Sequence, residues 1–307
     1  MQLRFRADRR ALFWSLGLFP ALPLLSYSRP ALAPWLLPVA LYLAYCAGVL
    51  AHNHNHAPVF WSKRLNTTYS AWLSFFYGCP LFVWVPTHNR NHHHYLDGHG
   101  DATRTSLLAP RDTGWAVLAY PTRSAIAQLP AIVKYVRAAR RGSKVRLRQI
   151  MLETASVGLG HVAVFLFAVL CHGLWSGALL YLLAFGLPAG FAAWSMMLTN
   201  YLQHAGCDPS SPDDHSRNFL SRWMNWWVFE AGYHTVHHEH AGTHWSLYPS
   251  LHVARASRIA PHLNQGTVLG YALHRYVSLP SIARIARSRV GDQRREEGDA
   301  KEAVSPG

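Results

Sequence analysis

Nine histidines fall into four short clusters whose spacing suits metal binding. Within the clusters the histidines stand mostly three or four residues apart, which on a helix places their imidazoles on one face. The nine candidate ligands are His52 and His56; His88, His92 and His93; His204; and His234, His237 and His238. One metal ion takes roughly four to six ligands, so nine imidazoles predict two ions.

The all-nitrogen ligand set indicates which metals are expected. Imidazole suits a redox-active borderline metal such as iron, whereas magnesium and calcium prefer oxygen ligands. Two iron ions can activate molecular oxygen and remove hydrogen from an unactivated C–H bond, which is too strong for acid–base chemistry. We expect water, oxygen, or Asn200 acting through a water molecule to complete the coordination. The chemistry predicted from these residues is oxidation with iron as cofactor and oxygen as co-substrate.

The composition points to a lipid environment. Of 307 residues, 50% are hydrophobic and only 14% are charged, well below the usual share of about a quarter. The formal net charge of +14 is compatible with a nucleic acid, an anionic membrane surface or an acidic protein partner. The four cysteines are scattered without a Cys-x-x-Cys pair, which argues against a zinc ribbon or a disulfide scaffold.

Four apolar stretches predict membrane-spanning helices. They cover residues 11–27, residues 31–51, and two segments within residues 150–202 that are separated by a break near His172. If both termini are cytoplasmic, 28 of the 29 Lys and Arg residues lie on the cytoplasmic side, as the positive-inside rule requires. This distribution explains the positive charge without a nucleic acid partner.

A fifth apolar segment, residues 69–85, is shorter and contains Gly78 and Pro80. If it crossed the bilayer, the first and second histidine clusters would lie on opposite sides. We therefore expect it to lie in the interface, or to dip into the bilayer and return. All four histidine-bearing elements then meet at the cytoplasmic membrane surface.

The order of clusters and spans resembles the membrane fatty acid desaturases. Three histidine boxes carry this resemblance, together with an extra Asn and His like those of stearoyl-CoA desaturase-like enzymes: His52-x3-His56, His88-x3-His92-His93, His234-x2-His237-His238 and Asn200-x3-His204. The resemblance covers roughly residues 31–252. It implies an all-α integral membrane protein with four transmembrane helices under a cytoplasmic helical cap. It further implies a di-iron site ligated by the nine histidines, and oxygen-dependent desaturation of an acyl chain held in an apolar tunnel.

The resemblance also predicts the partners and the domain boundaries. The substrate is expected to be an acyl-lipid, an acyl-CoA or an acyl-carrier. Because no His-Pro-Gly-Gly motif occurs, electrons are expected from a separate donor of the ferredoxin, rubredoxin or cytochrome b5 type. We expect a basic cytoplasmic N-terminus (residues 1–10), a desaturase domain (11–283) and a charged, disordered tail (284–307), in a multi-pass protein of a bacterial inner membrane.

Ten further histidines are given no ligand role. Five are expected to hydrogen-bond the metal ligands or to lie at the surface: His54, His94, His99, His240 and His244. His161 and His172 are expected to have structural roles. His252, His262 and His274 are expected at the surface. Residues 100–105 are expected to contact a polar head group or to cap a helix.

Two other stretches have open interpretations. Trp223, Trp226 and Trp227 either line a substrate entrance or form an interfacial aromatic belt. The basic run 137–148 suits an acyl carrier, an electron donor or anionic lipid.

Two rival functions use the same residues differently. A membrane hydroxylase or ketolase acting on an alkane, carotenoid or sterol would share the iron chemistry and differ in returning oxygen to carbon. A metal transporter or sensor would instead place histidines inside the spans along a midplane path, whereas these clusters stand at the ends of the spans.

Overall fold

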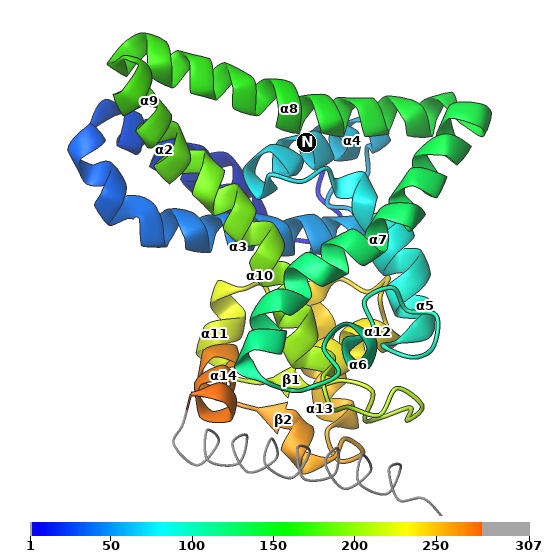
Figure 1. Ribbon diagram of the computed structural model, residues 1–307. Coiled ribbons are helices and arrows are strands. Elements are labelled where there is room, and N and C mark those ends of the chain that lie inside the picture. Colours follow the sequence, from blue (N-terminus) through cyan, green and yellow to red (C-terminus); the bar gives the residue numbers. More distant parts are fainter. Residues whose placement is uncertain (1, 278–307) are drawn as a thin grey trace, which may run out of the picture.

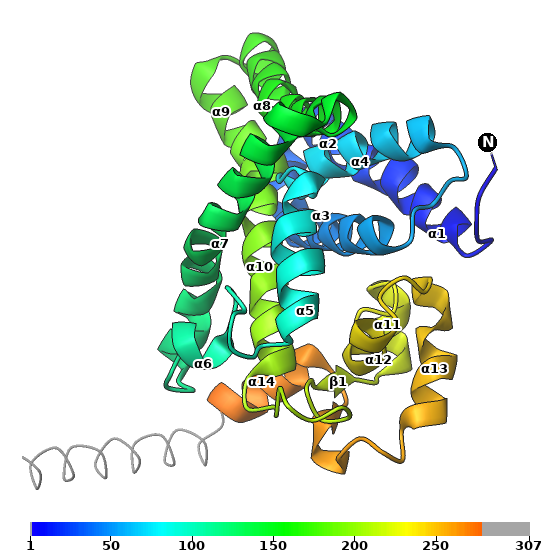
Figure 2. The ribbon, with the colours of Figure 1, turned by 90° about the vertical axis from the view of Figure 1, so that its right-hand side faces the viewer.

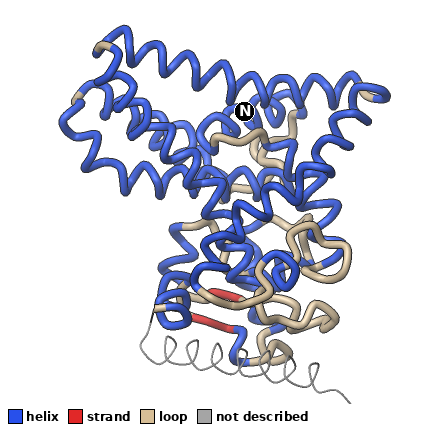
Figure 3. Tube along the Cα trace, viewed as in Figure 1, coloured by secondary structure: helices blue, strands red, loops and turns tan. Residues whose placement is uncertain are grey.

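The protein, seen in a computed structural model, is described for residues 2–277 and is mainly helical, with loops concentrated around the short helices (Figures 1 and 3). In the described part, strand structure is limited to the parallel pair β1 (Asn218–Phe219) and β2 (Asn264–Gln265) and to a single bridge between Leu3 and Phe60. The prediction of a helical protein is confirmed. The tail expected over residues 284–307 lies outside the described residues.

Within residues 2–277, four helical stretches are long and apolar enough to cross a membrane: Asp8–Ser28, Pro30–His56, Lys144–His172 and Leu174–His204. The elements that build them are α1 (Asp8–Leu12), the π-helical η1 (Phe13–Leu18) and α2 (Phe19–Ser28); η2 (Pro30–Leu32) and α3 (Ala33–His56); α8 (Lys144–His172); and α9 (Leu174–Tyr181), η5 (Leu182–Gly186) and α10 (Leu187–His204). Their sequence windows have mean hydropathies of 1.3 to 2.0, which agrees with an integral membrane protein.

The four stretches form two hairpins whose turns lie at the same end of the molecule, on the left in Figure 1. Tyr27, beside the first turn, donates its hydroxyl to the carbonyl of Val164 at 3.3 Å. Its ring meets that of His172, beside the second turn, at 6.5 Å. Gly173 ends α8 with φ 77°, a conformation open to glycine. Both turns are therefore remote from the histidine-bearing ends of α3 and α10.

Residues 69–85, expected to lie in the interface or to dip in and return, span the second half of α4 (Lys63–Tyr77) and η3 (Leu81–Val83). Ser62 caps the start of α4 by accepting a hydrogen bond from the Leu65 amide, and Gly78 ends the helix with φ 74°. Ser74 Oγ then accepts the Leu81 amide at 3.0 Å, which holds the reversed chain against the helix. The segment is not among the four candidate spans. It returns the chain so that the first and second histidine clusters meet.

The histidine-bearing ends of the spans lead into a cap of short helices and loops (Figure 2). Its elements are η4 (Val85–His92), α5 (His93–Tyr95), α6 (Thr105–Leu108), α7 (Gly114–Gly142), α11 (Arg222–Trp227), α12 (His234–Glu239), η6 (Trp245–Leu247), α13 (Tyr248–Arg255), η7 (Pro261–Leu263) and α14 (Val268–Tyr276). Only α7 is long. The other elements of the cap are short and are joined by loops.

A strained turn aims α12 into the cap. Phe229 and Glu230 both have left-handed backbones, with φ 50° and 61°, each at a cost of about 1–3 kcal/mol. The Asn225 side chain holds this turn, because its Oδ1 accepts the Gly232 amide at 2.9 Å and its Nδ2 donates to the Phe219 carbonyl at 2.7 Å. The three histidines of α12 follow directly.

The N-terminal residues are packed against the cap. The Arg4 amide donates to the Val59 carbonyl at 2.9 Å, and the buried carboxylate of Asp8 lies 3.0 Å from His244 Nε2. Phe5 stacks on the His244 ring with centroids 4.1 Å apart. Residues 2–10, expected as a separate basic segment, thus tie the first span to the loop after α12.

Candidate metal centre

Five histidines from three parts of the chain converge on one point. His52 and His56 stand one turn apart at the end of α3, His88 and His93 come from η4 and α5, and His237 comes from α12. Four of their Nε2 atoms form a closed ring: His52–His88 is 2.9 Å, His88–His93 is 3.0 Å, His93–His237 is 3.0 Å and His237–His52 is 3.1 Å. The His56 ring lies 4.7 Å from that of His93.

Four other histidines form a second group: His92, His204, His234 and His238. The Nε2 atom of His204 lies 2.8 Å from that of His234 and 3.1 Å from that of His238, and the last two are 3.0 Å apart. The His92 ring lies 4.6 Å from the His204 ring. All four side chains are buried. The two groups are neighbours, since the rings of His93 and His238 are 4.5 Å apart.

A π-helical turn divides the second histidine box between the groups. In an α-helix, residues five apart point about 140° away from each other. The π-helical η4 winds more slowly, which brings His88 and His93 to one side and leaves His92 for the other. The spacing His88-x3-His92-His93 therefore serves two groups.

The nitrogen geometry fits bound metal ions. Hydrogen bonds alone cannot satisfy three mutually adjacent Nε2 atoms, because each neutral ring nitrogen offers either one proton or one lone pair. For nitrogens at the corners of a 3.0 Å square, the centre lies about 2.1 Å from each, the length of a metal–imidazole bond. In addition, the Nε2 atoms of His56 and His92 are buried without a hydrogen-bond partner. The nine residues thus fit two ions.

Five of the cap histidines are held neutral, as metal ligands must be. Burial first, and then the neighbouring imidazoles, lowers the pKa values of His88, His234, His237 and His238 well below the ordinary value. The same causes lower the pKa of His93 to about 2. An uncharged ring presents a lone pair to a metal.

In several of these rings the Nδ1 atom, which points away from the histidine group, has a hydrogen-bond partner. His92 Nδ1 lies 2.8 Å from Asp101 Oδ2. Burial raises the pKa of Asp101, but the hydrogen bonds from His92 and Thr103 outweigh it and lower this pKa overall. An ionised Asp101 accepts only, so the proton sits on His92 Nδ1 and the Nε2 lone pair faces the second group. From sequence, Asp101 is considered only as part of residues 100–105, and no contact with a histidine is expected.

Of the two roles expected for residues 100–105, helix capping is not observed. Asp101 Oδ1 accepts from the amide and hydroxyl of Thr103, both at 2.7 Å. The helix that starts at Thr105 has no side-chain cap from within the segment. Its first amide donates instead to Asp97 at 2.6 Å. Through buried Asp101 and Thr103, the segment supports His92.

Two more supports come from a short helix and a loop that carry no sequence signal. Tyr248, at the start of α13, places its hydroxyl 3.0 Å from His237 Nδ1. The carbonyl of His215 accepts from His204 Nδ1 at 3.2 Å. His215 is itself buried, and burial lowers its pKa to about 4. No repeat or spacing in the sequence marks either residue.

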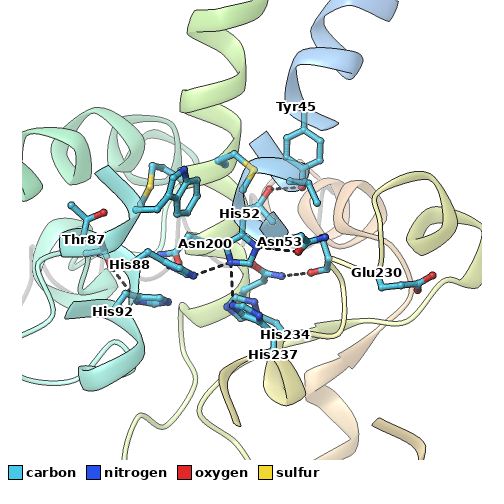
Figure 4. A pocket seen from close by; sticks show the side chains of 18 of the residues that line it. Tyr45, His52, Asn53, Thr87, His88, His92, Asn200, Glu230, His234 and His237 are labelled. Carbon is cyan, nitrogen blue, oxygen red and sulfur yellow. Dashed lines mark hydrogen bonds between the residues drawn. The ribbon is translucent and has the colours of Figure 1, made fainter. Parts of the chain in front are cut away.

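A cavity of about 60 Å³ adjoins both groups (Figure 4). Its walls include five of the nine histidines, namely His52, His88, His92, His234 and His237. Asn200 also lines it, and its Nδ2 donates to the Tyr120 hydroxyl at 2.9 Å. Toward the spans the cavity is lined by apolar Val49 from α3 and Met196 and Met197 from α10, together with Tyr45 and Thr199, whose hydroxyls are 3.4 Å apart.

Most of the remaining histidines lie where the sequence predicts. His54 is outside both groups, with Nε2 3.2 Å from the Asn66 carbonyl and Nδ1 accepting the Val59 amide. His161 links Tyr181 and the Phe75 carbonyl. The exposed histidines are His94, His99, His240, His262 and His274.

The surface position expected for His252 is wrong. Only 4% of this residue is exposed, because α13 turns it toward α12, where its ring lies 5.4 Å from that of Tyr233. The hydrophobic pattern of α13 is too short for its buried face to be identified from sequence.

The tryptophans of α11 lie largely at the surface. Trp223 and Trp226 are 75% and 48% exposed, while Trp227 is half-buried and packs against Trp14 with ring centroids 5.7 Å apart. None of the three lines the cavity. Of the two readings, this position favours the aromatic belt.

Comparison with known proteins agrees with this geometry. The family model described as fatty acid desaturase matches residues 29–266, which include all nine histidines and Asn200. No curated protein and no solved structure matches the chain. The family consists of oxidoreductases that are typically iron-dependent and act on lipid acyl groups in a membrane context. The chain belongs to the fatty acid desaturase family.

Proposed function

We propose that the protein is a di-iron desaturase that uses molecular oxygen to introduce a double bond into a fatty acyl chain. The observation that carries the proposal is the pair of adjacent histidine groups beside one cavity. His52, His56, His88, His93 and His237 would hold one iron ion, and His92, His204, His234 and His238 the other. Bound iron supplies the oxygen activation and hydrogen removal that no side chain provides.

The remaining residues would position the acyl chain and shape its surroundings. Val49, Met196 and Met197 offer an apolar wall along which methylene groups can pack beside the histidines. This arrangement excludes water from the reacting carbon, which protects it from side reactions. Asn200 stands one turn before His204 and faces the same cavity. The four-histidine group has one ligand fewer, so Asn200 suits a water-mediated contact there.

Orientation and partners follow from the charge distribution. The single basic residue Arg29 lies at the end where both hairpins turn, and the other described basic residues lie outside the spans or at their opposite ends. By the positive-inside rule, the cap and both termini are cytoplasmic. Electrons would then come from a separate cytoplasmic or membrane donor, of the ferredoxin, rubredoxin or cytochrome b5 type.

The test is mass spectrometry of the acyl lipids of cells that express the full chain, beside cells that express His237→Ala. We expect species lighter by two hydrogens in the first cells and none in the second. Species heavier by one oxygen would instead establish a hydroxylase at the same site. Unchanged lipids from an iron-loaded protein supplied with a donor would contradict both functions.

A further inference from the structure

The outer face of α7 is apolar over most of its length and faces away from the site. Its exposed residues lie at intervals that place them on one side of the helix: Trp115, Leu118, Ile126, Leu129 and Val133, which are 77%, 49%, 62%, 52% and 44% exposed. Interrupted only by exposed Thr122, this stripe extends over about five turns. A stripe of this length marks an interaction surface, whereas single exposed apolar residues do not.

The same face becomes basic where α7 meets α8. Six exposed basic residues surround the junction of α7 and α8 and are called the basic corner below: Lys134, Arg137, Arg140, Arg141, Lys144 and Arg148. No Asp or Glu occurs from residue 113 to residue 152. Within residues 2–277, none of the six forms an ion pair with a carboxylate. The corner therefore presents uncompensated positive charge to its surroundings.

The inner face of α7 borders the candidate site. Tyr120 accepts a hydrogen bond from Asn200 and donates one to the Thr103 carbonyl at 2.5 Å. Gln128 lines the cavity. The Leu118 carbonyl accepts from Trp194 Nε1 at 3.4 Å, which places this part of α7 beside the fourth span. The helix thus separates the cavity from whatever covers its outer face.

We propose that α7 lies in the surface of the bilayer, with its apolar stripe against acyl chains and its basic end on anionic head groups. Only Ser143 separates α7 from α8, so the basic corner stands where the third span begins. An acidic protein would suit this corner but would leave the stripe in water. An anionic lipid surface accommodates both.

The first test uses spin labels on the full chain in nanodiscs that contain phosphatidylglycerol, with Cys171→Ser as background because that cysteine is exposed. Labels at Ile126→Cys and Val133→Cys should collide more often with oxygen, which dissolves in acyl chains, than with a water-soluble nickel complex. Exposed Ser210 in a cap loop should show the opposite preference, and exposed Leu166 in α8 should match the stripe. Nickel accessibility at both stripe positions, or shielding from both reagents by a second protein copy, would overturn the proposal.

The second test addresses the basic end. The triple variant Arg137→Glu/Arg140→Glu/Arg141→Glu should lower the oxygen-to-nickel ratio at position 133 several-fold in anionic discs. Replacing phosphatidylglycerol with phosphatidylcholine should do the same to the unchanged chain. The matched control Lys63→Glu/Arg64→Glu, on exposed residues of α4, should have no effect. An unchanged ratio in the triple variant would exclude head-group contact and leave an acidic protein as the partner of this corner. Neither test depends on catalysis, so its failure is distinct from failure of the proposed function.

Discussion

The two histidine groups share the same ligand type but differ in their surroundings. In the five-histidine group His52, His56 and His93 are only half-buried, and the outer nitrogens of His52 and His237 meet the neutral side chains of Asn53 and Tyr248. The four-histidine group is fully buried, and its outer partners are the carboxylate of Asp101 and the carbonyl of His215.

Because of this difference, two metal ions bound in the two groups would have different ligand environments. A carboxylate behind His92 makes that imidazole a stronger donor than one paired with a hydroxyl. The four-histidine group also has fewer protein ligands and lies beside Asn200. We expect it to be the more electron-rich and rigid of the two, and the five-histidine group to be the more accessible.

Removal of one ligand from either group should have the largest effect. His237→Ala and His238→Ala should each reduce desaturation below detection, since an open coordination position and a buried gap replace an imidazole. Iron per protein, measured by plasma mass spectrometry, should fall in both variants. Full iron content in His237→Ala would show that this residue is not a ligand.

Asp101→Asn should have the next largest effect. The amide keeps the shape of the carboxylate but loses the charge that orients and polarises His92, so we expect about 10- to 100-fold weaker iron retention against a chelator. The matched control is Asp97→Asn, since Asp97 is also buried but bonds Thr105 and no histidine. Equal losses in the two variants would indicate general damage to the loop and would remove the distinction between the groups.

Tyr248→Phe should weaken the five-histidine group only modestly. It deletes one neutral hydrogen bond to His237, worth about 1 kcal/mol, or about fivefold in iron retention. Chelator competition on the purified protein measures this loss. A loss as large as that of Asp101→Asn would show that the two groups depend equally on their outer partners.

His54→Ala should lower the stability of the protein without removing iron or most of the activity. His54 lies one residue from Asn53 and two from His52, yet it bonds Asn66 and Val59 instead of joining either group. We expect full iron content and most of the activity, with a lower melting temperature from the loss of a buried hydrogen-bonded ring, about 1–3 kcal/mol. Loss of iron in this variant would show that the inner and outer faces of α3 are wrongly assigned.

Much of this arrangement follows from local sequence patterns, and the rest depends on contacts distant in the chain. Hydropathy identifies the spans, and box spacing identifies the nine clustered histidines, because both are properties of single helices. The division of His88, His92 and His93 between two groups depends on the π-helical winding of η4, which the sequence spacing does not reveal.

The supporting residues were beyond prediction for a different reason. Asp101, Tyr248 and His215 reach their partners from loops or short helices, so no periodic pattern marks them. His252 shows the same limit, since one short helix does not reveal which of its faces is covered.

The most direct test of the two-group account is X-ray absorption spectroscopy and iron quantification on the purified full chain. The account predicts about two iron ions per chain, each with a first shell dominated by imidazole nitrogen at about 2.1 Å. A single ion per chain, or a shell dominated by oxygen or sulfur, would contradict the assignment of nine histidines to two metal sites.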